Sequence, residues 1–583
     1  MNDRGMLFRF CLMGLFMLSV STVLGVRLAM LHLGPHEARL EQIERMHRFK
    51  QDLLGRRGTL LDGSGARSLL ALDLAADHVC ADPHVILQAD ALVPTASRLA
   101  ELLDLDVDAV AVRLHQPGRR YTRVQMFVPR EISRAVVDEN LTGVFLRPAH
   151  LRYYPHGSLA CHILGFVNHE GVGSAGIEQQ YDRYLRGRPG VIQGRLDAMR
   201  REIYTERVVA DPGEPGHTIE LTIDQHIQLV VERELDALIA SSQSQAAWAI
   251  VQDVRTGEIL AMASRPGYDL NDFRNSTPDQ RLNRAIGVNF EPGSSLKPAA
   301  FAAALNEGIV TPDTVFHAEH GSWLYQGRPL RDVSAQGYLT VTEGLQKSSN
   351  ILTAKMSLML GNDRLYQYLR DFGLGQPLGI DLPGEEAGIF HPPERWYGIS
   401  PTRIPIGQGI ATTALQVLTV QSTIANDGYR MRPYVVRRIL NAQGDVVLEN
   451  QPSVVARVIR SDTAATMREM LHVATEDGGT GRRARFAGMQ VAGKTGTAQK
   501  PGPGGYSDTD YIASFAGFFP VDNPVIAMII VADEPRPLTG GGRVAAPVFA
   551  VIGEEISRYL GLYTDGASPR MEIVHAAPDS HRR

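Results

Sequence analysis

The sequence has 583 residues, a net charge of −5 and three cysteines. This length exceeds what one hydrophobic core usually fills, so two or more domains are expected. No block of one charge sign occurs, which argues against nucleic acid as a partner. Cys11, Cys80 and Cys161 fit neither a disulfide framework nor a zinc site. Cys80 and Cys161 could form one bridge, but two free thiols are favoured.

An apolar stretch near the N-terminus has the length of a membrane-spanning helix. Phe10–Val26 carries no charged residue, and apolar neighbours extend the span to residues 7–33. A cleaved signal peptide is the alternative, but its apolar region is usually shorter and no A-x-A site follows. We therefore predict an uncleaved anchor. Arg4 and Arg9 favour a cytoplasmic location for residues 1–6, which puts the rest of the chain outside, although Arg27 and Arg39 reduce this charge bias.

Residues 34–220 carry no chemistry of their own and are predicted to form a separate domain. A helix is expected over His36–Leu54, followed after Arg57 by a strand that enters a glycine-rich turn. Residues 93–140 are expected to be helical, because their leucines recur at helical spacing. Further glycine-rich turns are expected within 152–178.

A second domain is predicted for residues 221–563, with 564–583 as a loose polar tail. Its expected elements are a strand at 221–224, a helix at 225–239, hairpin strands at 248–254 and 258–264, a mostly helical region at 294–430, strands at 489–494, 511–519 and 525–531, and a helix at 545–560. Strands at both ends with helices between them indicate an α+β fold, an antiparallel sheet with a helical insertion.

One pair of residues in the helical region suggests nucleophilic catalysis. Ser294 and Lys297 stand three residues apart, after the turn Pro292-Gly293 and at the head of an apolar run, Ala299–Leu305, that predicts a helix ending near Gly308. Residues i and i+3 share a helix face, so the hydroxyl and the amine would look into the same space. The helix N-terminus would favour negative charge developing near the serine.

The chain's use of lysine strengthens this interpretation. A lysine accepts a serine's proton only when its pKa falls from about 10.4 to near 7, a change that costs roughly 4 kcal/mol and that burial beside another cation can supply. The chain has six lysines, and only Lys297 has a serine three positions before it. Arginine cannot serve as such a base. Taken alone, the pair is equally well explained by an exposed lysine beside a helix-capping serine.

Two further motifs follow Ser294 and Lys297 along the chain. Ser348-Ser349-Asn350 comes after the Ser-x-x-Lys pair, and Lys494-Thr495-Gly496 comes later, followed by Thr497. Ser-x-Asn alone is a weak signal and Lys-Thr-Gly a moderate one. All three in this order form the signature of penicillin-binding proteins and serine β-lactamases.

With these motifs placed, the chain resembles the class B penicillin-binding proteins, most nearly the septal type of FtsI, over nearly its whole length. The other matching segments are Arg57-Gly58 with Asp62 and Gly65, Arg152 with Pro155 and Gly157, Gly173 with Gly176 and Glu178, Thr256–Ala261, and Gly407-Gln408-Gly409. Gly63 departs from the family, which often has a larger polar residue there. The resemblance implies an elongated pedestal domain of the dimerisation type at 34–220 and a transpeptidase domain at 221–563.

The resemblance also implies D,D-transpeptidation of peptidoglycan, with no cofactor and no metal. Ser294 would attack the carbonyl between the two terminal D-alanines of a stem peptide, and Lys297 would take its proton, although the identity of the base is disputed across these enzymes. Ser348 would pass a proton to the leaving D-alanine. Asn350 would orient Lys297, and Lys494 would keep Lys297 neutral.

The third motif would bind the substrate. The hydroxyls of Thr495 and Thr497 would hold its carboxylate, and the N–H groups of Ser294 and Thr497 would hold the oxyanion. The strand containing Gly496 would be a sheet edge on which the peptide docks as an added strand.

The partners implied by the resemblance are peptidoglycan stem peptides, β-lactams as inhibitors, and an FtsW-like membrane glycosyltransferase with other division proteins. The implied location is the bacterial inner membrane, with the catalytic domain in the periplasm. Three alternatives remain: an elongation-type transpeptidase, a β-lactamase or D,D-carboxypeptidase, and a non-catalytic β-lactam sensor or scaffold. The anchor and the pedestal-sized N-terminal half argue against a simple hydrolase. The lack of further spans or a metalloprotease motif argues against a sensor.

Overall fold

The computed structural model describes residues 3–33, 41, 44, 47–53, 55–196, 208–502 and 505–563. These residues form two compact units. One contains the chain up to Arg56 together with Gly187–Glu214, and the other contains Arg57–Arg186 and the chain from Pro215 onward. The predicted polar tail lies outside the described residues.

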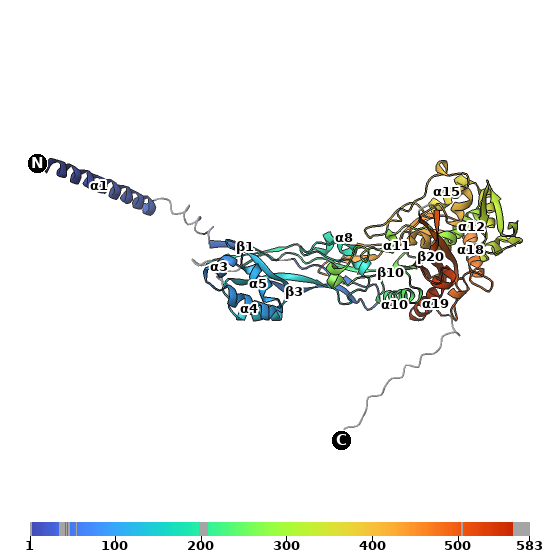
Figure 1. Cartoon of the computed structure of the whole chain (residues 1–583), viewed down its shortest axis with the longest axis horizontal. Coiled ribbons are helices and arrows are strands. Elements are labelled where there is room, and N and C mark those ends of the chain that lie inside the picture. The colour runs from blue at the N-terminus through green and yellow to red at the C-terminus, as the bar shows by residue number, and fades with distance from the viewer. Residues whose placement is uncertain are drawn as a thin grey trace, which may run out of the picture. The chain divides into compact units, whose positions relative to one another are not determined.

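The first unit contains the apolar N-terminal helix and a small antiparallel sheet. Helix α1 (Asp3–Leu33), blue in Figure 1, includes a span from Gly5 to Met30 that is long and apolar enough to cross a membrane. Strand β1 (Arg48–Leu53) pairs with β6 (Gly190–Arg195), which pairs with β7 (Val208–Asp211). The predicted helix up to Leu54 is therefore wrong at its C-terminal end, because pairing with a distant strand overrides the local pattern. Most of the rest of that predicted helix lies outside the described residues.

The second unit begins with a seven-stranded sheet in the order β17-β16-β8-β2-β3-β4, with β5 paired to β3. Its strands are β2 (Leu60–Leu61), β3 (Leu69–Ala81), β4 (Thr122–Pro129), β5 (Val144–Tyr153), β8 (Thr218–Leu221), β16 (Val436–Leu440) and β17 (Val446–Glu449). The last two come from late in the chain, so this sheet joins the N-terminal half to the C-terminal half.

Four helices pack beside strands β3, β4 and β5 of this sheet. They are α3 (Pro83–Gln88), α4 (Leu92–Leu103), α5 (Val107–Leu114) and α6 (Arg130–Asp138). Leu99, Val110 and Val124 belong to their shared apolar core. The helical prediction for 93–140 is confirmed for α4, α5 and α6 but wrong for β4. In β4 the buried positions Thr122, Val124 and Val128 have the two-residue period of a strand.

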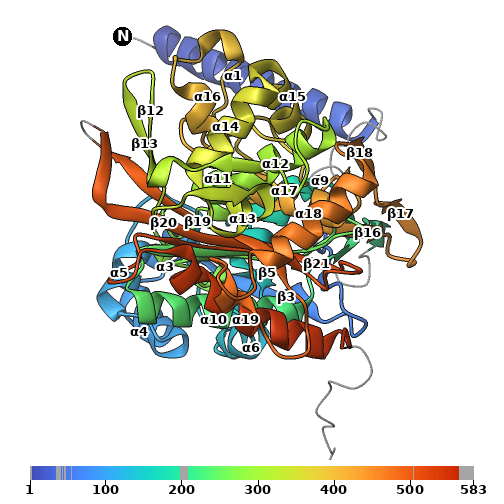
Figure 2. The same cartoon turned by 90° about the vertical axis from the view of Figure 1, so that its right-hand side faces the viewer.

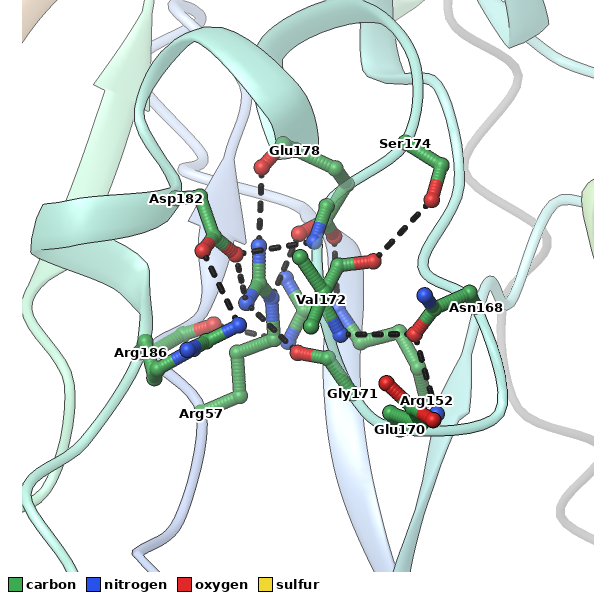
Figure 3. A network of polar contacts seen from close by, with 12 residues as sticks. Arg57, Arg152, Asn168, Glu170, Gly171, Val172, Ser174, Glu178, Asp182 and Arg186 are labelled. Atoms are coloured by element: carbon green, nitrogen blue, oxygen red, sulfur yellow. Dashed lines mark hydrogen bonds and ion pairs between the residues drawn. The ribbon is translucent and has the colours of Figure 1, made fainter.

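A buried ion-pair network organises the glycine-rich turns of this half (Figure 3). Glu178, on α8 (Gly176–Gln180), accepts hydrogen bonds from Arg57 Nε at 2.6 Å and Arg152 Nε at 2.7 Å. Asp182, at the start of α9 (Asp182–Leu185), accepts from Arg57 Nη1 at 2.6 Å. The Asp73 carboxylate accepts from the Arg57 backbone N–H at 2.8 Å. The network thus joins segments more than a hundred residues apart.

The structure gives a steric reason for glycine at position 63, where the family often has a larger residue. A Cβ at this position would lie 2.7 Å from the carbonyl oxygen of Leu221 and 2.8 Å from the backbone of Thr222. The carbonyl oxygen of Gly63 accepts a hydrogen bond from Arg437 Nη1 at 2.9 Å. Glycine therefore permits a close backbone approach where the two halves of the chain meet.

A five-stranded antiparallel sheet forms the centre of the C-terminal half, in the order β10-β9-β21-β20-β19. Strands β19, β20 and β21 are labelled in Figure 2. Its strands are β9 (Ala246–Asp253), β10 (Ile259–Arg265), β19 (Ala492–Gly502), β20 (Gly505–Phe519) and β21 (Ile526–Asp533). The expected hairpin is confirmed. The strand expected at 489–494 begins later and extends to Gly502, because it pairs with β20 as far as Gly505. Strand β19 is an edge of the sheet.

Helices cover both faces of this sheet, as its alternating side chains require. Helices α10 (Gln225–Ser242) and α19 (Gly541–Tyr559) lie on one face, where Ala249 joins their core. Trp248 and Ile250 point into the larger core on the other face. The helices of the insertion are α11 (Arg284–Gly287), α12 (Lys297–Asn306), α13 (Val341–Gln346), α14 (Asn350–Leu360), α15 (Asn362–Asp371), α16 (Ser400–Arg403), α17 (Ala414–Ala425) and α18 (Ser461–Val473).

Short strand pairs complete this half: β11 (Val315–His317) with β14 (Tyr338–Thr340), β12 (Ser322–Tyr325) with β13 (Arg328–Arg331), and β15 (Tyr429–Met431) with β18 (Val454–Arg457). The α+β prediction, with a helical insertion in an antiparallel sheet, is confirmed. Cys80 and Cys161 are buried free thiols, as favoured from the sequence.

Candidate active site

Ser294 lies in a tight turn at the start of the first insertion helix. A 3-10 turn spans Gly293–Leu296 and continues into α12, so the helix predicted from the apolar run is confirmed. Gly293 has φ +54°, and its N–H donates to the carbonyl of Gly407 at 3.1 Å. A Cβ on Gly407 would lie 2.1 Å from the carbonyl oxygen of Gly293, so only glycine allows this close approach. The turn leaves Ser294 partly exposed, while Ser295 beside it is buried.

Lys297 is fully buried and contacts the second motif directly. Its Nζ donates to Ser348 Oγ at 3.1 Å, to the Ser348 carbonyl at 2.6 Å and to Asn350 Oδ1 at 2.8 Å. A charged ammonium group has three protons, one for each of these acceptors. A neutral amine has two protons for two of the acceptors and keeps one lone pair on its nitrogen. The side chain is therefore fixed in place in either protonation state.

Burial and a second lysine both make Lys297 easier to deprotonate. Burial lowers the pKa of Lys297 well below its usual value, and the positive charge of Lys494 lowers it further. Burial also lowers the pKa of Lys494, to about 7. Both lysines of the motifs therefore lose protons far more readily than an exposed lysine, as a proton-accepting amine requires.

Ser349 and Asn350 are held by Asp332, a residue that the sequence pattern does not reveal. Asp332, in the loop after β13, accepts hydrogen bonds from the N–H groups of Asn350 at 2.5 Å and Ile351 at 3.0 Å. Its other oxygen accepts from Ser349 Oγ at 2.7 Å. An acidic side chain at the N-terminus of α14 is favourable, but nothing local in the sequence pairs position 332 with position 350. Ser348 itself has φ +59°, a strained conformation next to these contacts, and Lys297 Nζ donates to both its carbonyl and its hydroxyl.

The third motif lies on the edge strand β19. Lys494 is buried, and its Nζ donates to Thr480 Oγ1 at 3.4 Å and to Thr495 Oγ1 at 3.3 Å. Thr495 Oγ1 donates to Thr480 Oγ1 at 3.0 Å. Thr480 also went unrecognised in the sequence, since a single threonine before a strand carries no signal. The exposed Thr497 accepts at Oγ1 from the N–H of Gly541, the first residue of α19, at 3.1 Å.

Gly496, the glycine of the third motif, lies where an added side chain would collide with its neighbours. A Cβ there would lie 2.2 Å from Ser514 Oγ and 2.9 Å from the carbonyl oxygen of Pro292. Glycine therefore lets β19 approach the turn that carries Ser294. Gly496 does not line the cleft described next.

The predicted residues converge on one cleft of about 850 Å³. Ser294, Ser348, Asn350, Thr495 and Thr497 all line it. Lys297 and Lys494 lie buried beneath its floor, in contact with residues that line it. A partly exposed serine, a buried lysine of lowered pKa and an unpaired strand edge in one cleft suit acyl transfer from a peptide.

An acidic side chain, that of Glu291, also lines the cleft. Glu291 accepts from the N–H of Gly409 at 2.8 Å and from the Tyr506 hydroxyl at 3.0 Å. Burial raises the pKa of Glu291. Glu291, three residues before Ser294, thus links the Gly407-Gln408-Gly409 landmark to the β19–β20 hairpin.

Comparison with known families finds two matches. The penicillin-binding protein transpeptidase domain matches residues 247–554, and the penicillin-binding protein dimerisation domain matches residues 53–221. Peptidoglycan D,D-transpeptidase FtsI of Escherichia coli K12 is 31% identical over 565 residues, which cover 96% of this chain and 92% of the relative. The probable peptidoglycan D,D-transpeptidase PenA of Neisseria meningitidis serogroup A is 31% identical over 90% of this chain and 87% of the relative.

Solved structures give the same result. The crystal structure of penicillin-binding protein 3 from Mycobacterium tuberculosis has a TM-score of 0.69 and 30% identity, covering 89% of this chain and 98% of that one. That protein has also been solved with aztreonam and with ampicillin. A peptidoglycan synthetase from Bifidobacterium adolescentis has a TM-score of 0.71 and 26% identity, covering 90% and 98%.

Proposed function

The chain belongs to the penicillin-binding protein transpeptidases of the FtsI type and is a peptidoglycan D,D-transpeptidase; we propose that it acts at the division septum, with Ser294 as its nucleophile. The observation that carries the site assignment is the contact of buried Lys297 with both Ser348 and Asn350, beneath the cleft that Ser294 lines.

In the first half-reaction, Ser294 attacks the carbonyl that joins the two terminal D-alanines of a stem peptide. Lys297, held neutral by burial and by the charge of Lys494, takes the hydroxyl proton. The N–H groups of Ser294 and Thr497 stabilise the oxyanion. As the C–N bond breaks, Ser348 delivers a proton to the departing amine, and Lys297 resupplies Ser348 through the 3.1 Å contact. D-Alanine leaves, and an ester on Ser294 remains.

Substrate positioning falls to β19 and the neighbouring loops. The stem peptide lies along the free edge of β19 as an added strand, so that backbone hydrogen bonds fix its register. The hydroxyls of Thr495 and Thr497 bind its terminal carboxylate. Asn350 orients Lys297 and the substrate amide. A β-lactam presents a carbonyl and a carboxylate in a similar arrangement, so it acylates the same serine. No step requires a metal or a cofactor.

The two halves of the chain have different roles in this proposal. Residues 34–220 form a pedestal that binds partners, an FtsW-like membrane glycosyltransferase among them, and residues 221–563 carry the chemistry. Residues 7–33 anchor the protein, with residues 1–6 cytoplasmic and the catalytic domain in the periplasm. Removing residues 1–33 is expected to leave acylation by penicillin unchanged while abolishing function in the cell. Loss of acylation would contradict the division of roles.

The septal assignment is tested by depleting the protein in the bacterium that encodes it. Septal action predicts long filaments without septa, while cells that lose their shape but still divide would indicate elongation duty instead. Complementation with Ser294→Ala should fail, and complementation with Ser295→Ala should succeed. Ser295 is the matched control because, among the described residues, its buried hydroxyl bonds only the Pro292 carbonyl, at 2.8 Å.

A further inference from the structure

Aromatic side chains gather on the hairpin of β12 and β13, which projects from the helical insertion (Figure 2). The chain has only three tryptophans. Trp248 is buried in the sheet, whereas Trp323 on β12 and Trp396 are partly exposed. Tyr325, also on β12, is partly exposed, and Tyr397 is 83% exposed. A surface cluster of large aromatic side chains marks a binding site.

Contacts bring three of these rings to one surface. The ring centroids of Trp323 and Tyr325 are 5.2 Å apart. At the hairpin tip, Gln326 meets the segment that follows Tyr397, because a Cβ on Gly398 would lie only 2.1 Å from Gln326 Oε1. Tyr397 therefore lies beside the hairpin tip. Trp323, Tyr325 and Tyr397 are called the aromatic platform below.

The aromatic platform is held by packing and borders the catalytic cleft. Trp323 packs against a small apolar core that contains Ile406, and Ile406 lines the cleft. Lys355 Nζ lies 5.4 Å from the centre of the Trp323 ring and donates to the His317 carbonyl at 2.9 Å. A ring that the fold already orders binds a ligand at a smaller entropic cost.

Arg403 connects this hairpin to one end of the cleft. Its Nη2 donates to the Pro329 carbonyl in β13 at 3.0 Å, and its charge acts on the nearby Tyr506 hydroxyl. Tyr506, on the hairpin of β19 and β20, donates to Glu291, which lines the cleft. The two hairpins therefore flank the same end of the cleft.

The donor stem peptide leaves the cleft at this end. Its terminal carboxylate binds Thr495 and Thr497 in the proposed reaction, and the opposite direction along β19 leads to buried Lys494 and Ala492. The rest of the peptide thus follows β19 toward Gln499, which lines the cleft. Because its carboxyl end is D-alanine, the peptide is joined to its glycan strand through its amino end. A few extended residues span about 15 Å, so the sugars lie beside the two hairpins.

The aromatic platform suits the two kinds of surface that a sugar ring presents. A sugar has a face of C–H bonds, which packs on an aromatic ring, and a rim of oxygen atoms, which accepts hydrogen bonds. Arg328 at the hairpin tip is exposed, and its guanidinium has no hydrogen bond or ion pair within the described ranges. Exposed tryptophan, tyrosine and arginine are also typical of protein interfaces. The covalent link between the peptide in the cleft and its sugars favours the glycan.

We propose that Trp323, Tyr325 and Tyr397 bind the glycan strand that carries the donor stem peptide, outside the catalytic cleft. This inference rests on the proposed nucleophile Ser294 and adds a second binding site for the same substrate. The platform is remote from the reacting carbonyl, so it holds the sugars equally well in the ground state and in the transition state. It therefore lowers the KM for glycan-linked peptide and leaves kcat unchanged.

The test compares a free stem peptide with the same peptide on a short glycan strand. Each competes with fluorescent penicillin for Ser294 in the full-length protein in detergent, and the concentration that halves the rate of labelling is measured. Competition reports binding whether or not the purified protein turns the peptide over. In a second measurement, fluorescent glycan strands without peptides are titrated against the protein before and after its acylation by penicillin.

In the wild type, glycan-linked peptide should halve labelling at about a tenfold lower concentration than free peptide, the combined effect of three aromatic contacts. Peptide-free strands should bind equally well before and after acylation, because the platform lies outside the cleft.

Variants of the platform should remove this advantage. The double variant Tyr325→Ser, Tyr397→Ser should make the two peptides equivalent and weaken the binding of peptide-free strands by about tenfold. Tyr397→Ser alone, at an exposed position, should remove part of the advantage, and Tyr397→Trp should keep it because an aromatic ring remains. Tyr153→Ser, which removes an exposed tyrosine of β5, is the control and should behave as wild type.

Each other outcome overturns a distinct claim. Equal protection by the two peptides in the wild type would refute the platform and favour a protein partner for this surface. An advantage that persists in the double variant, or peptide-free strands that no longer bind after acylation, would place the sugars elsewhere and refute it as well. Weaker protection by free peptide in Tyr397→Ser would show that this tyrosine supports the cleft. Absence of penicillin from wild-type Ser294 would instead refute the proposed nucleophile, which the binding of peptide-free strands does not test.

Discussion

At the scale of single residues, the site depends on two lysines that the fold keeps out of water. The Ser-x-x-Lys pair predicts Lys297 as a base only when it is taken together with the two motifs that follow it, and the structure shows the burial and the neighbouring charge that such a base needs. Asp332 and Thr480 could not be predicted, because their roles come from tertiary contacts with Asn350 and Lys494 that no local pattern indicates. Motifs show the groups that react, and tertiary structure shows the groups that hold them.

The lowered pKa of Lys494 has a consequence for stability. Its folded-state pKa of about 7 lies below the unfolded value near 10.5, so between these two pH values the unfolded chain binds more protons and stability rises with pH. Lys494→Met should therefore stabilise the protein at pH 7. The electrostatic gain is roughly 4 kcal/mol, less the lost hydrogen bonds to Thr480 and Thr495.

Urea denaturation of wild type and Lys494→Met at pH 7 and at pH 10.5 tests this prediction. The advantage of the variant should be greatest at the lower pH and should disappear near 10.5. Lys500→Met is the control, because ion pairs with Asp533 and Glu534 raise the pKa of Lys500 instead. An advantage independent of pH would contradict the account.

Asp332 is predicted to be a positioning residue. Asp332→Ala removes the acceptor of three hydrogen bonds around Ser349 and Asn350, so the Ser348 hydroxyl should lose its alignment with Lys297. Acylation by penicillin should slow by roughly tenfold to a hundredfold. Asp332→Asn keeps an oxygen for the two N–H groups and should restore most of the rate. If Asn were as damaging as Ala, the charge and not the hydrogen bonding would be what matters.

At the scale of elements, close backbone approaches bring β19, α12 and α19 together. The central hairpin, the α12 helix and the last two long strands were predictable, because their patterns are strong and their partners are near in sequence. The local sequence pattern favours helix for the segments that form β1 and β4, because each of these strands depends on pairing with a distant strand. The start of β19 was placed three residues early, which did not affect the prediction that it forms a sheet edge.

A substitution at Gly541 tests the close backbone contact between α19 and β19. A Cβ there would lie 2.1 Å from the Ser514 carbonyl oxygen and 2.3 Å from that of Gly496, so Gly541→Ala should push α19 away from β19 and disturb Thr497. We expect a loss of about 1–3 kcal/mol in stability and slower acylation. Gly540→Ala is the matched control, because no heavy atom lies within 4 Å of its added Cβ. Thermal unfolding and penicillin acylation of both variants decide the matter; equal effects would contradict the steric argument.

At the scale of the whole molecule, a shared apolar core and several polar contacts join the two halves of the second unit. Strands β16 and β17 complete the N-terminal sheet, and Arg437 bonds both Glu258 and the carbonyl of Gly63. The apolar N-terminal helix and the two kinds of domain were predictable from composition and family resemblance. The sharing of one sheet by both halves was not, because no local pattern shows which distant strand a segment will join.

The buried ion-pair network of Figure 3 is predicted to stabilise the whole second unit. Glu178 is fully buried between Arg57 and Arg152, so Glu178→Gln leaves two buried guanidinium groups short of a negative charge. Stability should fall by about 3 kcal/mol or more. Arg98→Ala breaks the exposed pair with Glu139 and should leave the unfolding midpoint almost unchanged. Comparable losses in the two variants would show that burial does not determine the strength of the network.

The most direct test of the central claim is to map the residue that penicillin acylates. The purified protein is labelled with a fluorescent penicillin, digested, and the labelled peptide identified by mass spectrometry in wild type, Ser294→Ala and Ser295→Ala. The account predicts a long-lived adduct on Ser294 in the wild type and in Ser295→Ala, and none in Ser294→Ala. An adduct on another serine, or none on folded wild-type protein, would contradict the site, and an adduct that hydrolyses within minutes would indicate a hydrolase.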